Sequence, residues 1–577
     1  MLIKWTFMRP DDIVAEPKSD GERDDVEAAP SGASFLILVQ AFSKLGTFAL
    51  NQLLLRHISP KVLGLTSYLS FLQSSILFFS REGERLAIQR TEDTISVGER
   101  HNITSLNSRG QDASAAIIQS IANFGFIPSF IGLPVASLVC YWQSQHPFHE
   151  DVHMRKCYQI SLVLVFVLIG IELSSESLYA ISQYHLEFKK RSKFESVSVV
   201  LRFMAICFTI FAIRWLWHES VYFEGLCVCA LTFGQLVYSL SLTLCYYWDY
   251  SKEANKNFAL RIKGIIKKKG SGYYYFNPNV LAIWKSIFIQ LVFKQLLTEG
   301  DKLVIARLCS IEDQGVYSLV SNYGSMVARI AFLPIEETFR LSLTKLLLQR
   351  NKSNVSQSFK WLLYLCIFYV NLTVLIILGG YQNASYLLRL VLGGNSSMWL
   401  DTNVFDVLPR YVLYIPFLAF NGIFEAFFSS VASSKDIRAF SIYMSILSIF
   451  VMGLLYLLIE VYSMGLTGMI FANAINMTLR ILYCSHFIKR FFSEHKIFIS
   501  ESKCLLRLKY SITMACIIAC LQYRWLNTRS ESLLDVMVSA LLCLLYLSII
   551  LYSEKDTLST TSLTLKHLSI FKKGKKD

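Results

Sequence analysis

Long apolar segments, separated by shorter polar stretches, recur along nearly the whole chain. About fourteen of them approach or exceed the roughly 20 residues that a helix needs to cross the apolar core of a bilayer. Backbone polar groups inside lipid must find their hydrogen bonds within the segment, so the pattern predicts an all-α polytopic membrane protein. The predicted spans are 34–55, 62–80, 114–141, 158–181, 195–216, 221–247, 280–306, 314–335, 361–380, 409–432, 439–460, 464–484, 508–526 and 533–552.

Composition supports this interpretation and excludes a large soluble protein. Of the 577 residues, 53% are hydrophobic and only 17% are charged. A soluble fold of this length could not hide so much apolar surface in one core. Residues 1–33 are the exception, because they lack apolar runs and are rich in Asp and Glu. We expect that segment to be a disordered acidic tail.

The positive charges predict how the helices are oriented. Every second loop is rich in Lys and Arg, whereas 381–407 contains only Arg389. Basic loops stay on the cytosolic side, so we expect both termini in the cytosol, including a basic tail over 553–577. The net charge of +14 then reflects topology, and nucleic acid is not an expected partner. The loop after the second span holds Arg81, Arg85, Arg90, Arg100 and Arg109.

Two glycosylation sequons agree with this orientation. Asn383-Ala-Ser and Asn395-Ser-Ser both fall in the loop 381–407, on the face opposite the basic loops. Because N-glycans are added only on the lumenal or extracellular side, Asn383 and Asn395 are candidate acceptors. Asn102-Ile-Thr lies on the predicted cytosolic side and should stay unmodified.

A repeated pattern suggests an internal duplication. The pattern R-x-x-S-x-x-x-x-G-x-x-S-x-x-S-x-x-x-S starts at Arg56 and again at Arg307, 251 residues later. This offset corresponds to six predicted spans, which would keep the two copies parallel, although chance similarity of serine-rich helices is the alternative. The implied architecture has two six-helix lobes related by a pseudo-two-fold axis around a central cavity, plus two C-terminal helices. The predicted domains are lobe 34–248, basic cytosolic linker 249–279, lobe 280–484 and the added helices 485–552.

Polar residues form one face of each of two predicted helices. Gln40, Lys44, Thr47 and Asn51 follow helical spacing in the first span, and Gln290, Lys294, Thr298 and Asp301 do so in 280–306. A lysine facing lipid at mid-depth costs about 3 kcal/mol, so these faces should line a wet cavity or meet a partner. A cavity rich in Lys and Arg suits an anionic substrate such as a phosphate or pyrophosphate. The alternative is a network that only holds the lobes together.

For the other intramembrane charges, pairing between helices is the favoured interpretation. Glu172 and Glu176 share a helix face, where like charges repel without a counter-charge, and Arg202 is the candidate partner. The remaining scattered charges are Glu224, Glu425 and Arg480. No catalytic, nucleotide-binding, metal-binding or cofactor motif is present, and the thirteen Cys form no C-x-x-C pair. Lys573 and Lys575 fit a dilysine signal for retention in the endoplasmic reticulum, or a basic tail attracted to anionic lipid.

Several stretches together resemble the eukaryotic Rft proteins. They are Ser43–Thr47 with Asn51–Arg56, Leu297–Lys302, Arg329–Glu337 with Arg340, and Gly465–Arg480. The resemblance covers 34–552 and implies membership of the multidrug/oligosaccharidyl-lipid/polysaccharide exporter superfamily. It implies residence in the endoplasmic-reticulum membrane and flipping of dolichyl-pyrophosphate-linked Man5GlcNAc2 from the cytosolic to the lumenal leaflet for N-glycosylation. A non-transporting accessory factor of the same pathway is the alternative, and an ion-coupled drug exporter fits the basic residues less well.

A hypothesis for the residues follows from the resemblance. The pyrophosphate would be held by Lys44, Arg56, Lys294, Lys302 and Arg329. Sugar hydroxyls would bind Gln40, Asn51 and Gln290, while gating or lobe contact would fall to Glu299, Asp301, Glu336 and Arg340. The partners would be the dolichol-linked oligosaccharide and membrane lipid, with no catalytic residue and no cofactor.

Overall fold

The computed structural model describes residues 52, 54–89, 103–105, 113–146, 152–185, 187–217, 220–252, 258–267, 273–347, 351–393, 398–497, 501–526 and 530–553. Contacts divide the chain into Met1–Leu53 and Leu54–Asp577, and the architecture below is that of the second unit. The helix predicted over 34–55 and both tails therefore lie almost entirely outside the described residues.

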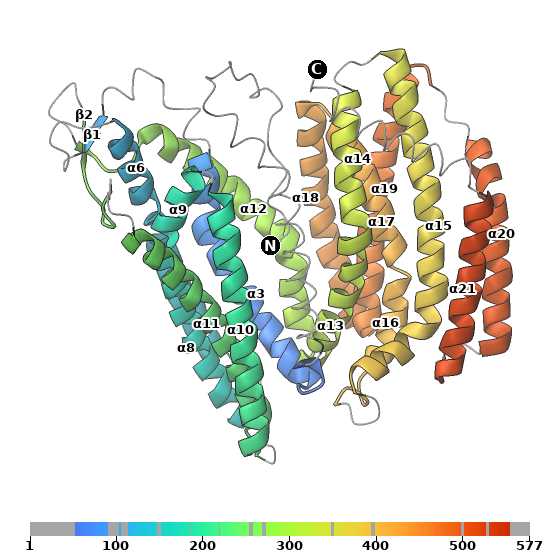
Figure 1. Cartoon of the computed structure of the whole chain (residues 1–577), viewed down its shortest axis with the longest axis horizontal. Coiled ribbons are helices and arrows are strands. Elements are labelled where there is room, and N and C mark those ends of the chain that lie inside the picture. Colours follow the sequence, from blue (N-terminus) through green and yellow to red (C-terminus); the bar gives the residue numbers. More distant parts are fainter. Residues whose placement is uncertain are drawn as a thin grey trace. The chain divides into compact units, whose positions relative to one another are not determined.

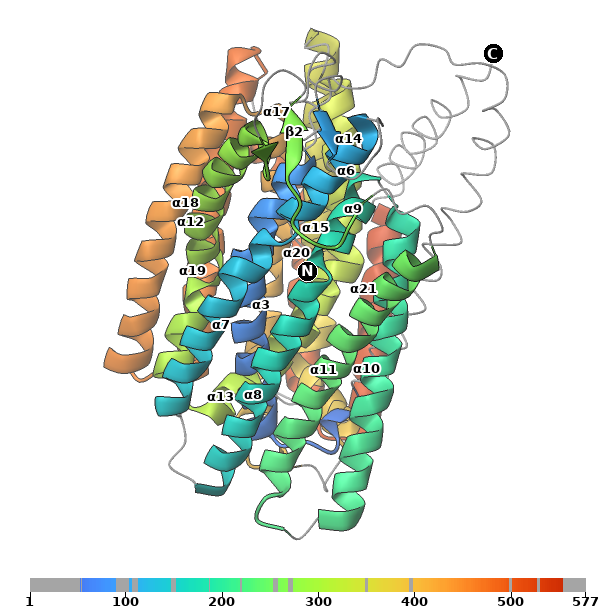
Figure 2. The same cartoon turned by 90° about the vertical axis from the view of Figure 1, so that its left-hand side faces the viewer.

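The first half of the second unit is built from long helices. They are α3 (Pro60–Gln89), α6 (Ala113–Phe124), α7 (Ile127–Gln145), α8 (Val152–Ser174), α9 (Glu176–Tyr184), α10 (Phe188–Trp217) and α11 (Phe223–Lys252). Helix α11 packs against both α8 and α10, and Figure 2 shows these three side by side. Helix α3 packs on α7 and α11 of this half, and still more extensively on α12 (Pro278–Leu308) and α13 (Ile311–Val327) of the second half.

The second half repeats this construction. Its helices are α12 (Pro278–Leu308), α13 (Ile311–Val327), α14 (Leu333–Leu346), α15 (Lys352–Val391), α16 (Val404–Val412), α17 (Ile415–Val431), α18 (Ser434–Tyr456) and α19 (Gly465–Glu494). Two further helices, α20 (Glu501–Leu526) and α21 (Leu533–Ser553), pack against each other and against α15 (Figure 1). Every predicted span from 62–80 onward thus coincides with a helix or with a broken pair of helices.

Several spans are broken where polar groups or close contacts interrupt the regular helix. The break between α6 and α7 falls at Gly125, where a Cβ atom would lie 2.8 Å from the backbone nitrogen of Ser177. The break between α8 and α9 falls at Ser175, whose hydroxyl donates to the carbonyl of Glu172 at 2.9 Å. Two π-helical turns, η2 (Ala328–Phe332) and η4 (Leu457–Val461), interrupt helices of the second half. Such turns admit an extra residue and are frequent at functional sites.

A small antiparallel sheet joins two loops that were predicted to be cytosolic and irregular. Strands β1 (Ile103–Ser105), β2 (Ile265–Lys267) and β3 (Tyr273–Tyr274) pair in the order β1-β2-β3. Beside the sheet, the side chain of Asn123 on α6 donates to the carbonyls of Lys263 and Tyr275, each at 2.8 Å. The segment 249–279 is therefore fastened to the end of α6, and the fold is all-α apart from these short strands.

The hydropathy of the helices confirms a polytopic membrane protein. Among the described residues, nine helical segments are long and apolar enough to cross a membrane. In the most apolar window of Leu533–Tyr552 only 11% of residues are buried inside the protein, and in that of Lys190–Trp217 only 22%. Such outward-facing apolar side chains suit contact with lipid. The other predicted spans are 34–55, which lies almost entirely outside the described part, and the shorter or more polar 280–306, 314–335, 464–484 and 508–526.

Candidate functional site

The residues predicted to bind substrate or to act in gating fall into three groups in the structure. Gln40, Lys44 and Asn51 lie outside the described residues. For a second group the structure describes the helical backbone but not the side chain, namely Gln290, Lys294, Glu299, Asp301 and Arg329. The side chains of Arg56, Lys302, Glu336 and Arg340 are described.

Two of the described basic residues lie where the first and second halves meet. Helix α12, the first helix of the second half, packs against α3 of the first half and against α18. On α12, the Lys302 ammonium lies 5.9 Å from the ring centroid of Phe71 on α3. Arg56, just before α3, donates from Nε to the carbonyl of Val391 at the end of α15, at 2.7 Å.

The duplicated pattern forms the contact between α3 and α13. Ser67 Oγ and Ser318 Oγ, which occupy the same position in the two copies, lie 2.8 Å apart. One turn earlier, a Cβ atom on Gly64 would lie 2.9 Å from the nitrogen of Gly315 and would overlap the carbonyl of Ile311. A Cβ atom on Gly315 would in turn overlap the carbonyl of Pro60. We call Gly64, Ser67, Gly315 and Ser318 the repeat contact.

Local hydrogen bonds are repeated as well. Ser310 caps the N-terminus of α13 by accepting from the backbone nitrogen of Asp313 at 3.1 Å, and Ser59 accepts from Val62 before α3 at 3.4 Å. A capping serine satisfies one of the free N–H groups at the start of a helix. Equivalent residues both cap their helices and meet each other, which supports the predicted duplication and a pseudo-two-fold relation at the repeat contact.

The loop between α15 and α16 closes over the same end of α3. Trp399 is fully buried, and its indole nitrogen donates to the carbonyls of Leu55 at 3.2 Å and Ile58 at 3.1 Å. These two carbonyls precede α3 and accept no backbone hydrogen bond from the described residues, so the tryptophan satisfies them. Together with Arg56 and the repeat contact, Trp399 joins the halves at the end of α3 that carries its N-terminus.

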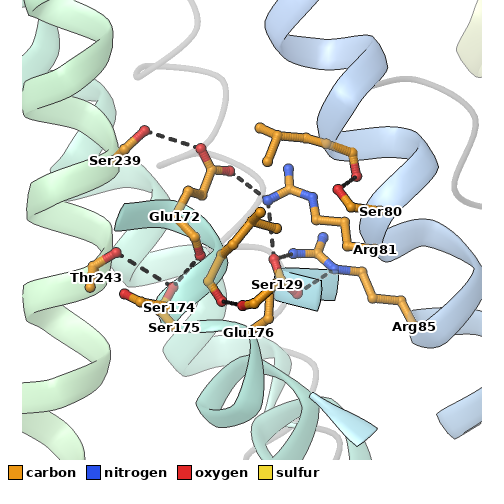
Figure 3. Close-up of polar contacts among 12 residues, drawn as sticks. Ser80, Arg81, Arg85, Ser129, Glu172, Ser174, Ser175, Glu176, Ser239 and Thr243 are labelled. Carbon is orange, nitrogen blue, oxygen red and sulfur yellow. Dashed lines mark hydrogen bonds and ion pairs between the residues drawn. The ribbon is translucent and has the colours of Figure 1, made fainter. Parts of the chain in front are cut away.

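A buried charged network lies near the other end of α3 (Figure 3). Arg81 contacts Glu172 at 2.6 Å and Glu176 at 3.1 Å, while Arg85 holds the same Glu176 by a two-point contact. Ser239 on α11 donates to the second oxygen of Glu172 at 3.0 Å. We call Arg81, Arg85, Glu172 and Glu176 the charged network, and it ties α3, α8, α9 and α11 together.

Two predictions about these charges are wrong. Arg81 and Arg85 were expected in a basic cytosolic loop, but α3 continues through them and both side chains turn inward. Arg202 was the expected partner of Glu172 and Glu176, but its guanidinium carbon instead lies 5.6 Å from the ring centroid of Phe203. A partner for Glu172 and Glu176 was expected among residues of the predicted spans. Their actual partners, Arg81 and Arg85, lie in a segment that was predicted to be a loop.

The second half has its own internal pair, as the sequence predicted for scattered charges. Arg480 on α19 contacts Glu425 on α17 at 2.7 Å, and Asn421 donates to the same carboxylate at 3.3 Å. Nearby, Glu336 on α14 presses its carboxylate against Gly422, where any Cβ atom would overlap it. Glu336 therefore contacts α17 of its own half. Among the described residues, no group of three or more His, Cys, Asp or Glu side chains is arranged to hold a metal.

Asn383 is not the open-loop acceptor that the sequon predicted. It lies inside α15 and is only 4% exposed. Its amide nitrogen donates to Gly379 and to Ser539 on α21, each at 2.8 Å, and its oxygen accepts from Ser530 at 2.6 Å. A glycan on this nitrogen would have to displace α21, so the expected place of Asn383 in an open loop is wrong, and its role as an acceptor stays a prediction. Asn395 lies outside the described residues.

Comparisons with known proteins assign a family. The family described as "Rft protein" matches residues 29–563. The chain is 38% identical over 501 residues to the "Man(5)GlcNAc(2)-PP-dolichol translocation protein RFT1" of Candida albicans, covering 84% of this chain and 86% of that protein. With the protein of the same name from Saccharomyces cerevisiae it is 35% identical, covering 93% and 95%.

The fold also matches a solved transporter. The structure described as "Inward-facing conformation of a multidrug resistance MATE family transporter of the MOP superfamily" aligns with a TM-score of 0.52. The alignment covers 78% of this chain and 94% of that protein at 10% sequence identity. At this level of identity the likeness concerns the fold, and it agrees with the two related halves described above.

Proposed function

Because the chain belongs to the Rft protein family, we propose that it translocates dolichyl-pyrophosphate-linked Man5GlcNAc2 from the cytosolic to the lumenal leaflet of the endoplasmic-reticulum membrane. The observation that carries the proposal is the relation, along nearly the whole chain, to proteins named for translocation of this glycolipid. The transporter-like fold supports it, since the halves of such folds surround a path across the membrane.

The charge of the substrate explains what the path must supply. A pyrophosphate with its oligosaccharide cannot enter hydrocarbon without losing its hydration, which costs far more than thermal energy. Basic groups facing a wet path offset this loss, and we assign that role to Lys44, Arg56, Lys294, Lys302 and Arg329. Gln40, Asn51 and Gln290 would bind sugar hydroxyls, while the lipid tail stays in the bilayer.

In this proposal, the repeat contact closes one end of the path and opens during transport. By the predicted orientation, the N-terminus of α3 faces the lumen, so the repeat contact, Arg56 and Trp399 close the lumenal end. We infer that these contacts must separate before the oligosaccharide reaches the lumen. Glu336 contacts α17 within the second half, so we assign it to the internal packing of that half. Glu299, Asp301 and Arg340 remain candidates for gating.

The test is leaflet transfer in sealed liposomes. Purified protein is reconstituted with a labelled dolichyl-pyrophosphate oligosaccharide, and the fraction accessible from outside is followed in time. Wild type should transfer the lipid above the rate of protein-free vesicles, and a Lys44→Glu/Lys294→Glu variant that folds normally should not. Binding without transfer by the wild type would favour the accessory role instead.

A further inference from the structure

Among the described residues, one carboxylate beside the charged network has no hydrogen-bond partner. Glu84 on α3 is 0% exposed, and neither of its side-chain oxygens is bonded. By contrast, both oxygens of Glu172 and of Glu176 accept hydrogen bonds from arginine or serine. Glu84 therefore lies next to two arginines whose described ion pairs are made with other acids.

The region around the charged network contains one more carboxyl group than it has arginines. Arg81 and Arg85 provide two positive charges against the three carboxyl groups of Glu84, Glu172 and Glu176. The pairs with Glu172 and Glu176 are short, at 2.6 and 3.0 Å, so both positive charges are used. A third ionised carboxylate would be buried without compensation, which is the situation in which a group takes up a proton instead.

Among the side chains that the structure describes, the elements around Glu84 supply no further positive charge. The charged groups that interact electrostatically with Glu84 are two acids and two bases. The acids are Glu176 on α9 and Glu82 on α3, and the bases are Arg85 and Arg81. Helices α6 and α7 contain no charged residue. From α12, Trp284 reaches the neighbouring Gly83, and the adjacent Lys285 is exposed to the surroundings.

We propose that Glu84 is a proton-binding site of the first half. In the packed state its carboxyl group holds one proton, taken from water, and is neutral. Releasing that proton to water leaves a carboxylate that competes with Glu176 for Arg85. Deprotonation therefore weakens the contact of α3 with α9, and proton binding at Glu84 is linked to the packing of this region. This inference does not depend on which substrate the protein carries.

Infrared spectroscopy of the full-length protein in detergent tests the proposal without a transport assay. The wild type at neutral pH should show the carbonyl stretch of a protonated carboxyl group, and Glu84→Gln should lose that band. Glu82→Gln, which changes the half-buried acid two residues earlier, should keep it. An equal band in wild type and Glu84→Gln would overturn the proposal.

The melting temperatures of the variants provide a second test of the proposal. Glutamine mimics the neutral acid, so Glu84→Gln should melt within a few degrees of the wild type, whereas Glu176→Gln should melt well below it. If Glu84→Gln fails to fold, the ionised form is required and the proposal is wrong. The proposal is equally wrong if sodium chloride, compared with choline chloride at equal strength, abolishes the band in the wild type. That outcome would identify a metal-cation site.

Discussion

The repeat contact and the charged network join helices by opposite means. The repeat contact lies between the halves and consists of two glycines and two serines, with one hydroxyl pair at 2.8 Å. The charged network lies within the first half and consists of buried Arg–Glu pairs, as does Glu425–Arg480 in the second. Small residues let helices approach closely without strong electrostatic attraction, whereas a buried ion pair is costly to separate. In the function proposed above, each half stays intact while the contact between the halves opens.

The largest effect should come from breaking the charged network. Removing one partner of a buried pair leaves an uncompensated charge and costs about 3–5 kcal/mol. Glu176→Ala should therefore strongly lower the melting temperature and the yield of monodisperse protein, measured by fluorescence-detected size exclusion after heating. The exposed pair Arg490–Glu494, at 2.9 Å, provides the control, because solvent screens this pair and Glu494→Ala should leave the melting temperature nearly unchanged. Equal losses in both variants would contradict the special role of the buried pair.

Adding a methyl group to the repeat contact should separate the halves. Gly315→Ala places a Cβ atom into the carbonyl of Pro60, and overpacking of this kind costs about 1–3 kcal/mol. We expect each half to remain folded while leaflet transfer in liposomes falls by at least tenfold. Gly453→Ala is the matched control, because a Cβ atom there meets nothing within 4 Å. Full transfer by Gly315→Ala would show that the contact is dispensable.

Locking the repeat contact should stop transfer reversibly. The hydroxyls of Ser67 and Ser318 lie 2.8 Å apart, so Ser67→Cys/Ser318→Cys should form a disulfide under mild oxidation. If this contact must open, oxidation should abolish transfer and a reductant should restore it. The two single-cysteine variants control for oxidation of native thiols. Undiminished transfer by the cross-linked protein would place the path elsewhere.

We expect Asn383, in the sequon of α15, to carry no glycan. We expect the Asn383→Gln variant to migrate on a gel like the wild type before and after glycosidase treatment. Its lost hydrogen bonds with Ser530 and Ser539 should cost about 1–2 kcal/mol, seen as a modest drop in melting temperature. A mobility shift caused by this substitution would mean that Asn383 is exposed in the mature protein.

The smallest effect concerns His57, which lies before α3 at the same end as the repeat contact. Burial, assisted by the nearby charges of Arg214 and Arg56, lowers the pKa of His57 from its usual 6.5. Arg214 donates to Nδ1 of the neutral ring. Since the unfolded chain binds this proton more readily, stability should be complete above pH 6.5 and decline as pH falls through the lowered pKa. A His57→Asn variant should show less of this decline in melting temperature, and an unchanged pH profile would exclude His57 as its source.

Much of the fold could be predicted because its signal is local. Runs of apolar residues gave the helices, and the R-x-x-S-x-x-x-x-G pattern located the two copies that meet at Ser67 and Ser318. The breaks at Gly125 and Ser175 depend on contacts with other helices, and no local pattern marks them. Strands β1 to β3 are only two or three residues long and owe their existence to pairing between loops distant in sequence.

The charges were harder to place, for a physical reason. A membrane span was assumed to end near its first arginine, so Arg81 was assigned to a loop. The helix instead continues because Glu172 and Glu176 neutralise its arginines inside the bundle. Sequence could have suggested this, since Arg81, Glu84, Arg85 and Ile88 follow helical spacing. The converse error at Asn383 has the same origin, because the partners that bury it are 147 and 156 residues away.

The residues that bury Asn383 are synthesised after it. Its hydrogen-bond partners Ser530 and Ser539 are synthesised 147 and 156 residues after it, roughly 10–30 s later at typical rates of translation. During that interval the nascent chain displays an unprotected Asn-Ala-Ser triplet. A sugar attached then would leave no room for α21 against α15 and would produce a mis-assembled chain. If this triplet faces the lumen, as the predicted orientation has it, docking of α21 against α15 ends the interval in which Asn383 is open to modification.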